Sequence, residues 1–312
     1  MHKQRTRLTK RVNRVAASVE RRGVAATYEL HDRLLSNRFA RHRYTDMPPL
    51  LDAQQREIVE ALDRDGYVAL PFVDLMHDQA LADEVQAMGD AFIERTEAAL
   101  RSGGRLKVRA GKEYVARRYS FEGATIGPDD PWFRAVSSRR MLDIANAYLR
   151  LWSKLSYVDL WFTVPQQPDE PRTASQNWHF DFDDKHLLKA FVYLVDVEAD
   201  MGPFEFVPGS QPGGRYHSVR PWTPMGYGRV SDEDVAKSVA PADIRSFTAP
   251  RGTLLLCNTS GLHRGGYSNG DPRVLATATY CSPASLASLS RRNYTPAVDV
   301  TTLDDVTRFA LS

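Results

Sequence analysis

The stretch YVDLWFTV, residues 157–164, marks the point at which the periodicity of the sequence changes. Apolar, aromatic and β-branched residues alternate with others here, which is typical of a β-strand. Similar short runs follow later in the chain: FVYLVDV (191–197), FEFVPGS (204–210), GTLLLCN (252–258) and RVLATATY (273–280). Pro, Gly and Asp turns separate these runs, and no helix is predicted between them. The pattern therefore indicates an antiparallel β sandwich or barrel rather than β-α-β units.

The sequence before this point has a helical pattern. Asp52 and Gln55 have the spacing of a capping box before an apolar helical face, and Gly66 can end that helix. The same periodicity predicts two further helices, over residues 78–100 and 141–152. We therefore expect an α+β chain. Its expected parts are a basic helical arm (1–45), a helical N-terminal part packed on the core (46–155), a β core (156–285) and a C-terminal tail (286–312).

Composition narrows the class of protein. The chain has 312 residues, of which 42% are hydrophobic and 26% charged, as in an ordinary globular protein with a large core. A formal net charge of +2 argues against a nucleic-acid-binding protein. Cys257 and Cys281 are too few for a disulfide framework, and no apolar run reaches the roughly 18 residues of a membrane span. We expect a cytoplasmic protein, and the sequence does not indicate its oligomeric state.

The basic charge is concentrated at the start of the chain. Residues 1–22 carry eight lysines and arginines against Glu20 alone. The apolar residues of this segment fall on one face of a predicted helix: Leu8, Val12, Val15, Ala16 and Val19. This pattern fits a helix lying on an anionic membrane or an acidic partner. It fits equally a helix packed on the protein itself or at a subunit contact.

The stretch NWHFDFDD, residues 177–184, suggests a metal site. In a strand, His179 and Asp181 point to the same face and can reach one ion. His263 follows a buried-looking strand and a short turn, so its imidazole can return toward the same place. Two imidazoles and one carboxylate form the facial triad of non-haem Fe(II) oxygenases, which leaves three coordination positions open. Each of these residues alone is better explained as a packed or hydrogen-bonded side chain, and His217 has little chance of being a ligand.

Arg273 opens the strand that follows His263. An arginine that enters a β core needs an anionic partner, because an unpaired buried charge costs several kcal/mol. Its planar guanidinium suits a carboxylate. The partner could be a protein acid at the end of the strand, but together with the histidines a dicarboxylate cosubstrate fits better.

The segment WHFDFDDKHLLKAFVYLVDVEADMGPFEFVPGSQ (178–211), followed by GLHRGGYSNGDPR (261–273), resembles the phytanoyl-CoA dioxygenase family of Fe(II)/2-oxoglutarate-dependent oxygenases. The resemblance implies a double-stranded β-helix, a cupin-like jelly roll, with helices packed against it. It implies Fe(II) bound by His179, Asp181 and His263, with 2-oxoglutarate and O2 as cosubstrates. By position, Arg273 would hold the distal carboxylate of 2-oxoglutarate.

Other positions carried over from the family are less certain in role. Phe191 is expected close to the cosubstrate, and Lys189 beside it is either a second anion contact or a strand-edge residue. The chain has Gln211 where the family usually has histidine, at a position that is not a metal ligand. It has Gly265 where relatives place a hydroxyl residue, which leaves the secondary contacts to 2-oxoglutarate open.

The activity implied by the resemblance is hydroxylation of an unactivated carbon in a small molecule, such as a lipid, acyl thioester, sugar or other metabolite, with release of succinate and CO2. Asp181 favours hydroxylation over halogenation, because related halogenases have glycine there. The alternatives are desaturation, cyclisation or epimerisation by the same oxidant, or a catalytically silent β-barrel binding module. Basic residues that could contact an anionic substrate, or form a solvated surface, are Arg105, Lys107, Arg109, Lys112, Arg117, Arg118, Arg215, His217 and Arg220.

Overall fold

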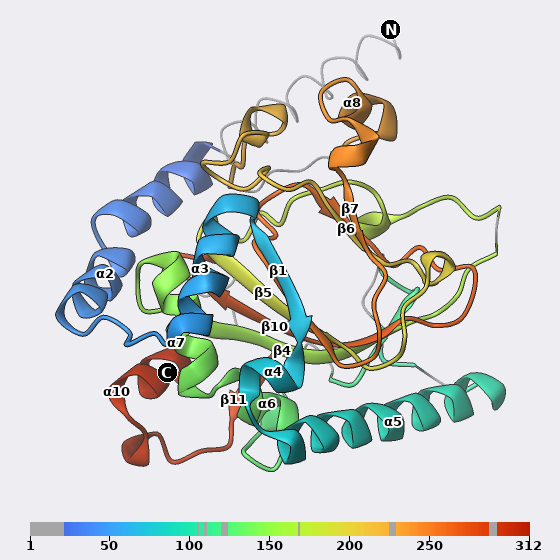
Figure 1. Ribbon diagram of the computed structural model, residues 1–312, viewed down its shortest axis with the longest axis horizontal. Helices are drawn as coiled ribbons and strands as arrows, with labels where there is room; N and C mark the ends of the chain where they lie inside the picture. The colour runs from blue at the N-terminus through green and yellow to red at the C-terminus, as the bar shows by residue number, and fades with distance from the viewer. Residues whose placement is uncertain are drawn as a thin grey trace, which may run out of the picture.

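The computed structural model describes residues 22–104, 106–108, 111–119, 124–167, 169–224, 229–286 and 292–312. The apolar face predicted between residues 8 and 19 lies outside these residues. The described chain mixes helices with mainly antiparallel sheets (Figure 1). None of its helices is long and apolar enough to cross a bilayer.

Two antiparallel sheets carry the candidate site. The larger has the order β1-β8-β5-β10-β4-β2, formed by Tyr67–Pro71, Thr253–Cys257, Leu187–Tyr193, Val274–Cys281, Lys154–Thr163 and Val115–Arg117. The smaller has the order β7-β6-β9, formed by Arg245–Phe247, Phe204–Phe206 and His263–Arg264. A separate parallel pair joins β11 (Tyr294–Pro296) to β3 (Ala124–Ile126). The antiparallel arrangement predicted from the short strand runs is therefore confirmed.

The two faces of the larger sheet have different neighbours. On β5, Leu188, Ala190 and Val192 belong to the main core, which they share with the helices. Phe191 and Tyr193 point the other way and pack with β6 of the smaller sheet. Alternation along the strand thus places one set of residues in the helix-sheet core and the other set between the sheets. The candidate site lies on this second face.

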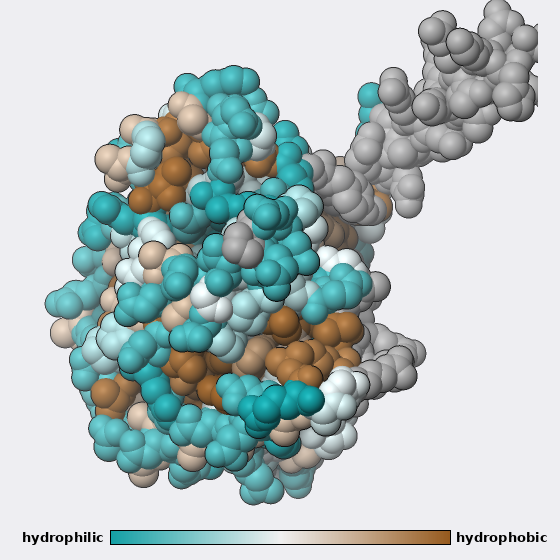
Figure 2. All heavy atoms as spheres, turned by 90° about the vertical axis from the view of Figure 1, so that its right-hand side faces the viewer, coloured by the Kyte–Doolittle hydropathy of each residue, from teal (hydrophilic) through white to brown (hydrophobic). Residues whose placement is uncertain are grey.

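Helices surround the larger sheet on its other side (Figure 1). Residues 22–33 are helical. The named helices are α2 (Ser36–Asp46), α3 (Ala53–Asp65), α4 (Phe72–Met76), α5 (Gln79–Arg101), α6 (Pro131–Val136), α7 (Arg139–Leu149), α8 (Asp232–Ala236) and α10 (Asp305–Leu311). The face seen in Figure 2 is mostly hydrophilic, with separate apolar patches.

The capping signals in the sequence set the ends of α3. The Asp52 side chain accepts a hydrogen bond from the Gln55 backbone N–H, and the Gln55 side chain accepts one from the Asp52 N–H. Gly66 ends the helix in the left-handed conformation, with φ of 81°, and the chain turns directly into β1. The predicted helix and both of its end signals are confirmed. The segment expected to be helical therefore also contributes a strand to the larger sheet.

Several predicted boundaries differ from the structure. Helix α5 matches the prediction for 78–100 within a residue at each end. Helix α7 ends at Leu149 rather than 152, because Arg150 adopts a left-handed conformation with φ of 54°. The strand predicted over 191–197 is shifted: β5 begins four residues earlier and ends at Tyr193.

The expectation that residues 177–184 form a strand is wrong. Within the described part of the chain, the β pairing of this segment consists of two isolated antiparallel bridges, between Trp178 and Val230 and between His179 and His263. Trp178 and His179 each pair with a single residue, and the two partners belong to different segments of the chain. Alternating sequence predicts an extended backbone here, but a continuous ladder also requires a partner strand alongside.

Candidate metal and cosubstrate site

The two histidines predicted as ligands are paired through their backbones. The N–H of His179 donates to the carbonyl of His263 over 2.9 Å, and the reverse hydrogen bond is 2.8 Å. Their rings are both buried, with centroids 4.2 Å apart. Residues 84 positions apart in sequence are thus fixed side by side by one antiparallel bridge.

Each imidazole is also oriented by a backbone carbonyl. Nδ1 of His179 lies 2.9 Å from the carbonyl oxygen of Asn177, and Nδ1 of His263 lies 3.0 Å from that of Gly261. A carbonyl can only accept, so both rings carry their proton on Nδ1. The lone pair of each Nε2 is then free, as metal-ligating histidines require.

Asp181 brings a carboxylate to the same place. Its Oδ2 lies 3.9 Å from Nε2 of His263 and 2.6 Å from Nζ of Lys189. The backbone is held as well: the N–H of Asp181 donates to the carbonyl of Thr259 over 2.7 Å, and the indole N–H of Trp222 donates to the carbonyl of Asp181 over 2.8 Å. Among the described residues, His179, Asp181 and His263 form the one group whose ligand atoms could share a metal ion, all within 4.8 Å of one another.

The protonation states of these groups suit a cation. Burial lowers the pKa of His263 to about 4 and that of His179 well below its usual value, so both rings are neutral near pH 7. Burial alone would favour the neutral acid at Asp181, but Lys189 and the two imidazoles outweigh it and hold the pKa of Asp181 far below its usual range. The three groups thus offer two neutral nitrogen ligands and one carboxylate without first losing a proton.

Lys189 is not a strand-edge residue, because its strand β5 lies between β8 and β10. Its ammonium pairs with Asp181 instead. Phe191, two residues along the strand, lines the same pocket. The strand-edge alternative for Lys189 is therefore excluded.

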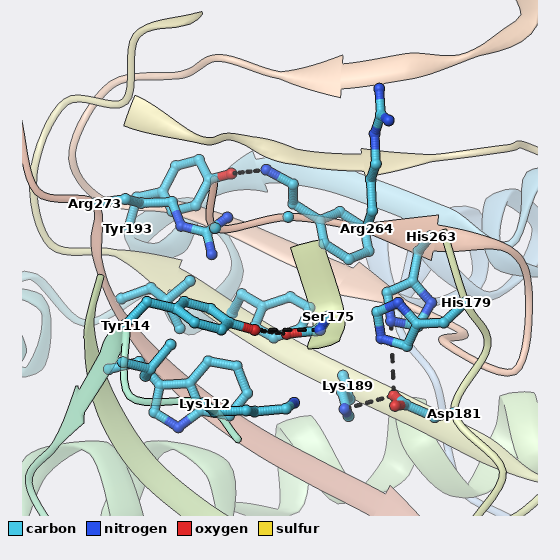
Figure 3. Close-up of a pocket in the computed structure, with 17 residues that line it drawn as sticks. Lys112, Tyr114, Ser175, His179, Asp181, Lys189, Tyr193, His263, Arg264 and Arg273 are labelled. Atoms are coloured by element: carbon cyan, nitrogen blue, oxygen red, sulfur yellow. Dashed lines mark hydrogen bonds and ion pairs between the residues drawn. The ribbon is translucent and has the colours of Figure 1, made fainter. Parts of the chain in front are cut away.

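Arg273 lies at the opposite end of the pocket from the three candidate ligands (Figure 3). Its side chain is buried, and its Nε and Nη1 atoms make no hydrogen bond to any described residue. A Cβ atom at Gly265 would come within 3.1 Å of Nη1, and one at Gly266 within 3.3 Å of Nη2. The two glycines therefore leave room for the guanidinium, and Gly265 serves this purpose where a hydroxyl residue was expected.

Several pocket residues were not predicted from the sequence. The hydroxyl of Tyr114 lies 2.6 Å from that of Ser175, and the Ser175 carbonyl accepts from the N–H of Gly265 over 3.1 Å. These residues form the wall between the two ends of the pocket (Figure 3). Tyr193 and Phe204 complete the wall beside Arg273. A tyrosine before a strand and a serine in a 3-10 turn carry no sequence signal for such a role.

The basic residues proposed as substrate contacts are widely dispersed. Only Lys112 lines the pocket. Arg118 forms an ion pair with Asp130. Arg215 forms one with Asp243, and neither of these two residues is close in sequence to the candidate ligands. Lys107 and Arg220 are exposed, and Arg117 lies over the rings of Tyr157 and Trp161. His217 has a buried Nδ1 and is not a pocket residue; Arg105 and Arg109 lie outside the described residues.

Gln211 is buried, and neither polar atom of its amide has a hydrogen-bond partner among the described residues. It faces Gly66, where an added Cβ would come within 2.4 Å of its Oε1. The substitution of histidine by glutamine at this position therefore does not touch the three candidate ligands.

Comparison with known protein families identifies the chain. Residues 62–274 match the model of the phytanoyl-CoA dioxygenase (PhyH) family. The chain belongs to this family. As a family member it is an iron- and 2-oxoglutarate-dependent oxygenase, and the predicted resemblance is confirmed.

Solved structures are similar to the chain at low sequence identity. EctD from S. alaskensis with 2-oxoglutarate and 5-hydroxyectoine is 20% identical, with a TM-score of 0.50 over 79% of this chain and 83% of that one. AviO1 from Streptomyces viridochromogenes Tue57 is 18% identical, with a TM-score of 0.49 over 76% and 98%. The epimerase SnoN from nogalamycin biosynthesis is 20% identical, with a TM-score of 0.45 over 73% and 81%. No curated protein sequence matched the chain significantly.

Proposed function

We propose that this family member is a hydroxylase that uses Fe(II), 2-oxoglutarate and O2 to oxidise an unactivated carbon of a small molecule. The observation that carries the proposal is the pocket itself. One end holds two imidazoles with free Nε2 atoms and a carboxylate, and the other holds a buried guanidinium with unpartnered N–H groups. The first end suits a divalent metal and the second suits a carboxylate.

The candidate ligands fit iron by their chemistry. His179 and His263 would hold the metal through Nε2, and Asp181 through its carboxylate. When bound, Fe(II) with 2-oxoglutarate supplies the activation of O2 that oxidises a C–H bond and releases succinate and CO2. Asp181 supplies the anionic ligand and leaves no vacancy for a halide, which supports hydroxylation over halogenation.

The remaining residues would position 2-oxoglutarate. Arg273 would bind its distal carboxylate, and the hydroxyl of Tyr114 would help to orient it. Lys189 would act through Asp181, by holding one carboxylate oxygen 2.6 Å from its ammonium. Phe191 and Phe204, with ring centroids 5.4 Å apart, would exclude water from the space between the two ends.

We infer that the two antiparallel sheets are the halves of a double-stranded β-helix. The pairing of β6 with β9, and the single bridge from His263 to His179, support a small sheet facing the large one. The catalytic core would run over 156–285 with helices from 46–155 packed on it, strands β1 and β2 of that segment extending the larger sheet. Residues 1–45 would form an arm and 286–312 a tail.

A spectroscopic titration tests the proposal. Addition of 2-oxoglutarate to the Fe(II)-loaded protein without oxygen should produce a weak visible absorption band. With oxygen, succinate should form, and its rate should rise when a substrate is added. A catalytically silent binding module would give neither band nor succinate. Product analysis by mass spectrometry separates a gain of oxygen from desaturation, cyclisation or epimerisation.

We also propose that the N-terminal arm contacts an anionic membrane and that the protein is cytoplasmic. Apolar side chains are exposed in the described part of this arm: Leu30, Leu34, Leu35 and Phe39. Within the described residues, Cys257 and Cys281 are both buried and form no disulfide, which supports a reducing compartment. Deletion of residues 1–22 should weaken sedimentation with anionic vesicles and leave turnover of a dissolved substrate unchanged. Equal sedimentation of both proteins would refute the membrane contact.

A further inference from the structure

The carboxylate of the metal end is held differently from the two imidazoles. His179 and His263 are fixed to each other by backbone pairing, whereas Asp181 lies beyond that bridge. The peptide carbonyl of Asp181 accepts a hydrogen bond from the indole N–H of Trp222 over 2.8 Å. Trp222 belongs to a segment without helix or strand, so its own position depends on side-chain contacts. A residue that holds Trp222 in place therefore also helps to hold Asp181.

Tyr28 packs against Trp222. It belongs to the helix formed by residues 22–33, which precedes α2 in the chain (Figure 1). The centroids of the two rings lie 5.1 Å apart, with an angle of 49° between the ring planes. Tyr28 is completely buried, and Trp222 is half-buried. An aromatic pair at this distance contributes stabilisation beyond the area that it buries, so Tyr28 supports the residue that donates to the Asp181 carbonyl.

Tyr28 also contacts the chain just after Asp181. Its hydroxyl donates to Oδ1 of Asp184 over 2.5 Å and accepts from the backbone N–H of Lys185 over 3.2 Å. The Asp184 carboxylate is buried, and its other oxygen accepts from the N–H of Ser282 over 2.7 Å. A buried carboxylate is stable only where hydrogen bonds satisfy its oxygens. The donor from Tyr28 therefore helps to fix the backbone three residues after Asp181.

An ion-pair cluster keeps the helix of Tyr28 in place on this segment. Asp32, one turn after Tyr28, is buried, and its Oδ2 lies 2.6 Å from Nζ of Lys185. Its Oδ1 lies 3.1 Å from Nε2 of His186. A shift of the helix would separate this buried acid from its partners, which is strongly unfavourable. The position of Tyr28 relative to the metal end is therefore well defined.

The helix lies outside the part of the chain that the family model matches. That match covers residues 62–274, whereas Tyr28 precedes it by more than one helix and lies 156 positions before Asp184. Tyr28 is also absent from the described residues that line the pocket, so its effect on the metal end is indirect.

We propose that Tyr28 is a positioning residue of the metal end, which acts on Asp181 through Trp222 and through Asp184. The inference rests on the proposed function, in which Asp181 is a ligand of Fe(II), and it makes the N-terminal helix a working part of that site. Outer partners that orient a metal ligand typically change metal affinity when they are removed.

Anaerobic Fe(II) titration of three single variants tests the proposal. Trp222→Phe keeps an aromatic ring but removes the donor to the Asp181 carbonyl, so Fe(II) affinity should fall about tenfold or more. Tyr28→Phe keeps the ring against Trp222 but removes the hydroxyl, so Fe(II) affinity should fall about fivefold. Tyr294→Phe is the matched control, because it also removes a buried tyrosine hydroxyl, which donates to the carbonyl of Leu155 over 2.7 Å on the separate β3-β11 side.

Two further measurements separate positioning from a general loss of stability. With iron saturating, the KM for 2-oxoglutarate should stay unchanged in Tyr28→Phe, because the Arg273 end is not in contact with Tyr28. In the metal-free protein, the backbone amides of residues 181–186 should exchange hydrogen faster in Tyr28→Phe and in Trp222→Phe than in the wild type. Urea unfolding measures the global stability of each variant, and Tyr294→Phe should leave the exchange of residues 181–186 unchanged.

Wild-type Fe(II) affinity in Tyr28→Phe would overturn the proposal, whatever the effect of Trp222→Phe. An equal loss of Fe(II) affinity in Tyr294→Phe would overturn it as well, since the loss would then follow from stability alone. Absence of Fe(II) binding by the wild type would instead contradict the proposed function. In that case the exchange of residues 181–186 still decides whether Tyr28 holds this segment, and unchanged exchange in Tyr28→Phe would refute it.

Discussion

The two ends of the pocket differ in how completely the protein satisfies its own polar groups. At the metal end, both imidazoles donate to carbonyls and Asp181 is paired with Lys189. At the other end, two nitrogen atoms of the buried Arg273 guanidinium have no hydrogen-bond partner among the described residues. The metal end is thus preorganised, whereas the Arg273 end is complete only when an anion is bound. The difference indicates that a bound ligand must stabilise the Arg273 end.

Backbone geometry explains this difference. At the metal end, a backbone bridge joins His179 to His263, so both imidazoles are attached to hydrogen-bonded backbone. The Arg273 end is built around space: Gly265 and Gly266 offer no side chain, and the guanidinium occupies the volume beside them. Backbone pairing fixes the positions of the side chains at the metal end, whereas the space beside the two glycines allows a ligand to enter at the Arg273 end.

Loss of Asp181 should have the largest effect, because it removes the only carboxylate of the metal end. Asp181→Ala should weaken Fe(II) binding by on the order of 100-fold or more and abolish succinate formation. Metal titration of the folded variant, with Asp181→Asn alongside, measures this. Asp183→Ala is the matched control, since Asp183 is not part of the metal group and its carbonyl accepts from Leu286 and Ser285. An inactive Asp183→Ala with an active Asp181→Ala would mean that the register of the site is shifted.

Loss of Arg273 should affect the other end alone. Arg273→Leu would leave a carboxylate of 2-oxoglutarate unpaired, at a cost of about 2–5 kcal/mol, which is roughly 30-fold to several thousand-fold in affinity. Steady-state kinetics should show a raised KM for 2-oxoglutarate, while metal titration shows unchanged binding. Arg215→Leu serves as the control. Wild-type cosubstrate dependence in Arg273→Leu would mean that another residue holds the carboxylate.

Acid should destabilise the metal-free protein through the metal end. The folded-state pKa of His263 is about 4, below the usual histidine pKa of about 6.5, because the ring is buried. The unfolded chain therefore takes up the proton first, and stability is lost as the pH falls from about 6.5 toward 4. A shift of this size corresponds to on the order of 3 kcal/mol. Urea unfolding at pH 7 and pH 5 should show the loss, and His263→Gln should reduce it; an equal pH dependence in both would exclude His263 as its source.

Tyr114 should have the smallest effect. Tyr114→Phe removes one hydroxyl beside Ser175 at the Arg273 end and keeps the ring. A single neutral hydrogen bond contributes about 1 kcal/mol, so the KM for 2-oxoglutarate should rise about fivefold. Metal affinity should stay the same. A large fall in metal affinity would show that the wall between the two ends is not independent of the metal end.

Local signals in the sequence predicted the parts of the fold that depend on neighbouring residues. The capping box of Asp52 and Gln55 and the left-handed Gly66 placed α3 because each acts within one helical turn. The alternation in β5 placed Phe191 and Tyr193 on one face. The end of α7 was not predicted because Arg150 adopts the left-handed conformation there, and glycine is the residue that usually signals such a helix end.

The site was predicted unevenly for a similar reason. His179, Asp181 and His263 come together as expected, but not on one continuous strand: a bridge joins His179 to His263, and a backbone hydrogen bond joins Asp181 to Thr259. The partner of Lys189 could not be read from its own strand, since the chain must turn to bring Asp181 back to it. Tyr114 precedes β2 and Ser175 lies in a 3-10 turn, and the positions of both depend on tertiary contacts that no periodicity records.

The position of Lys189 has a consequence for the protein in a cell. Because β5 has a neighbouring strand on each side, the ammonium of Lys189 does not reach the edge of the sheet. It relies on Asp181 for its counter-charge. Removal of one partner of such a pair costs roughly 3–5 kcal/mol of folding stability. A larger unfolded fraction would be exposed to proteases. Substitution of Asp181 should therefore lower the amount of enzyme in the cell as well as its turnover. A measurement of protein abundance would then detect the substitution even without an activity assay.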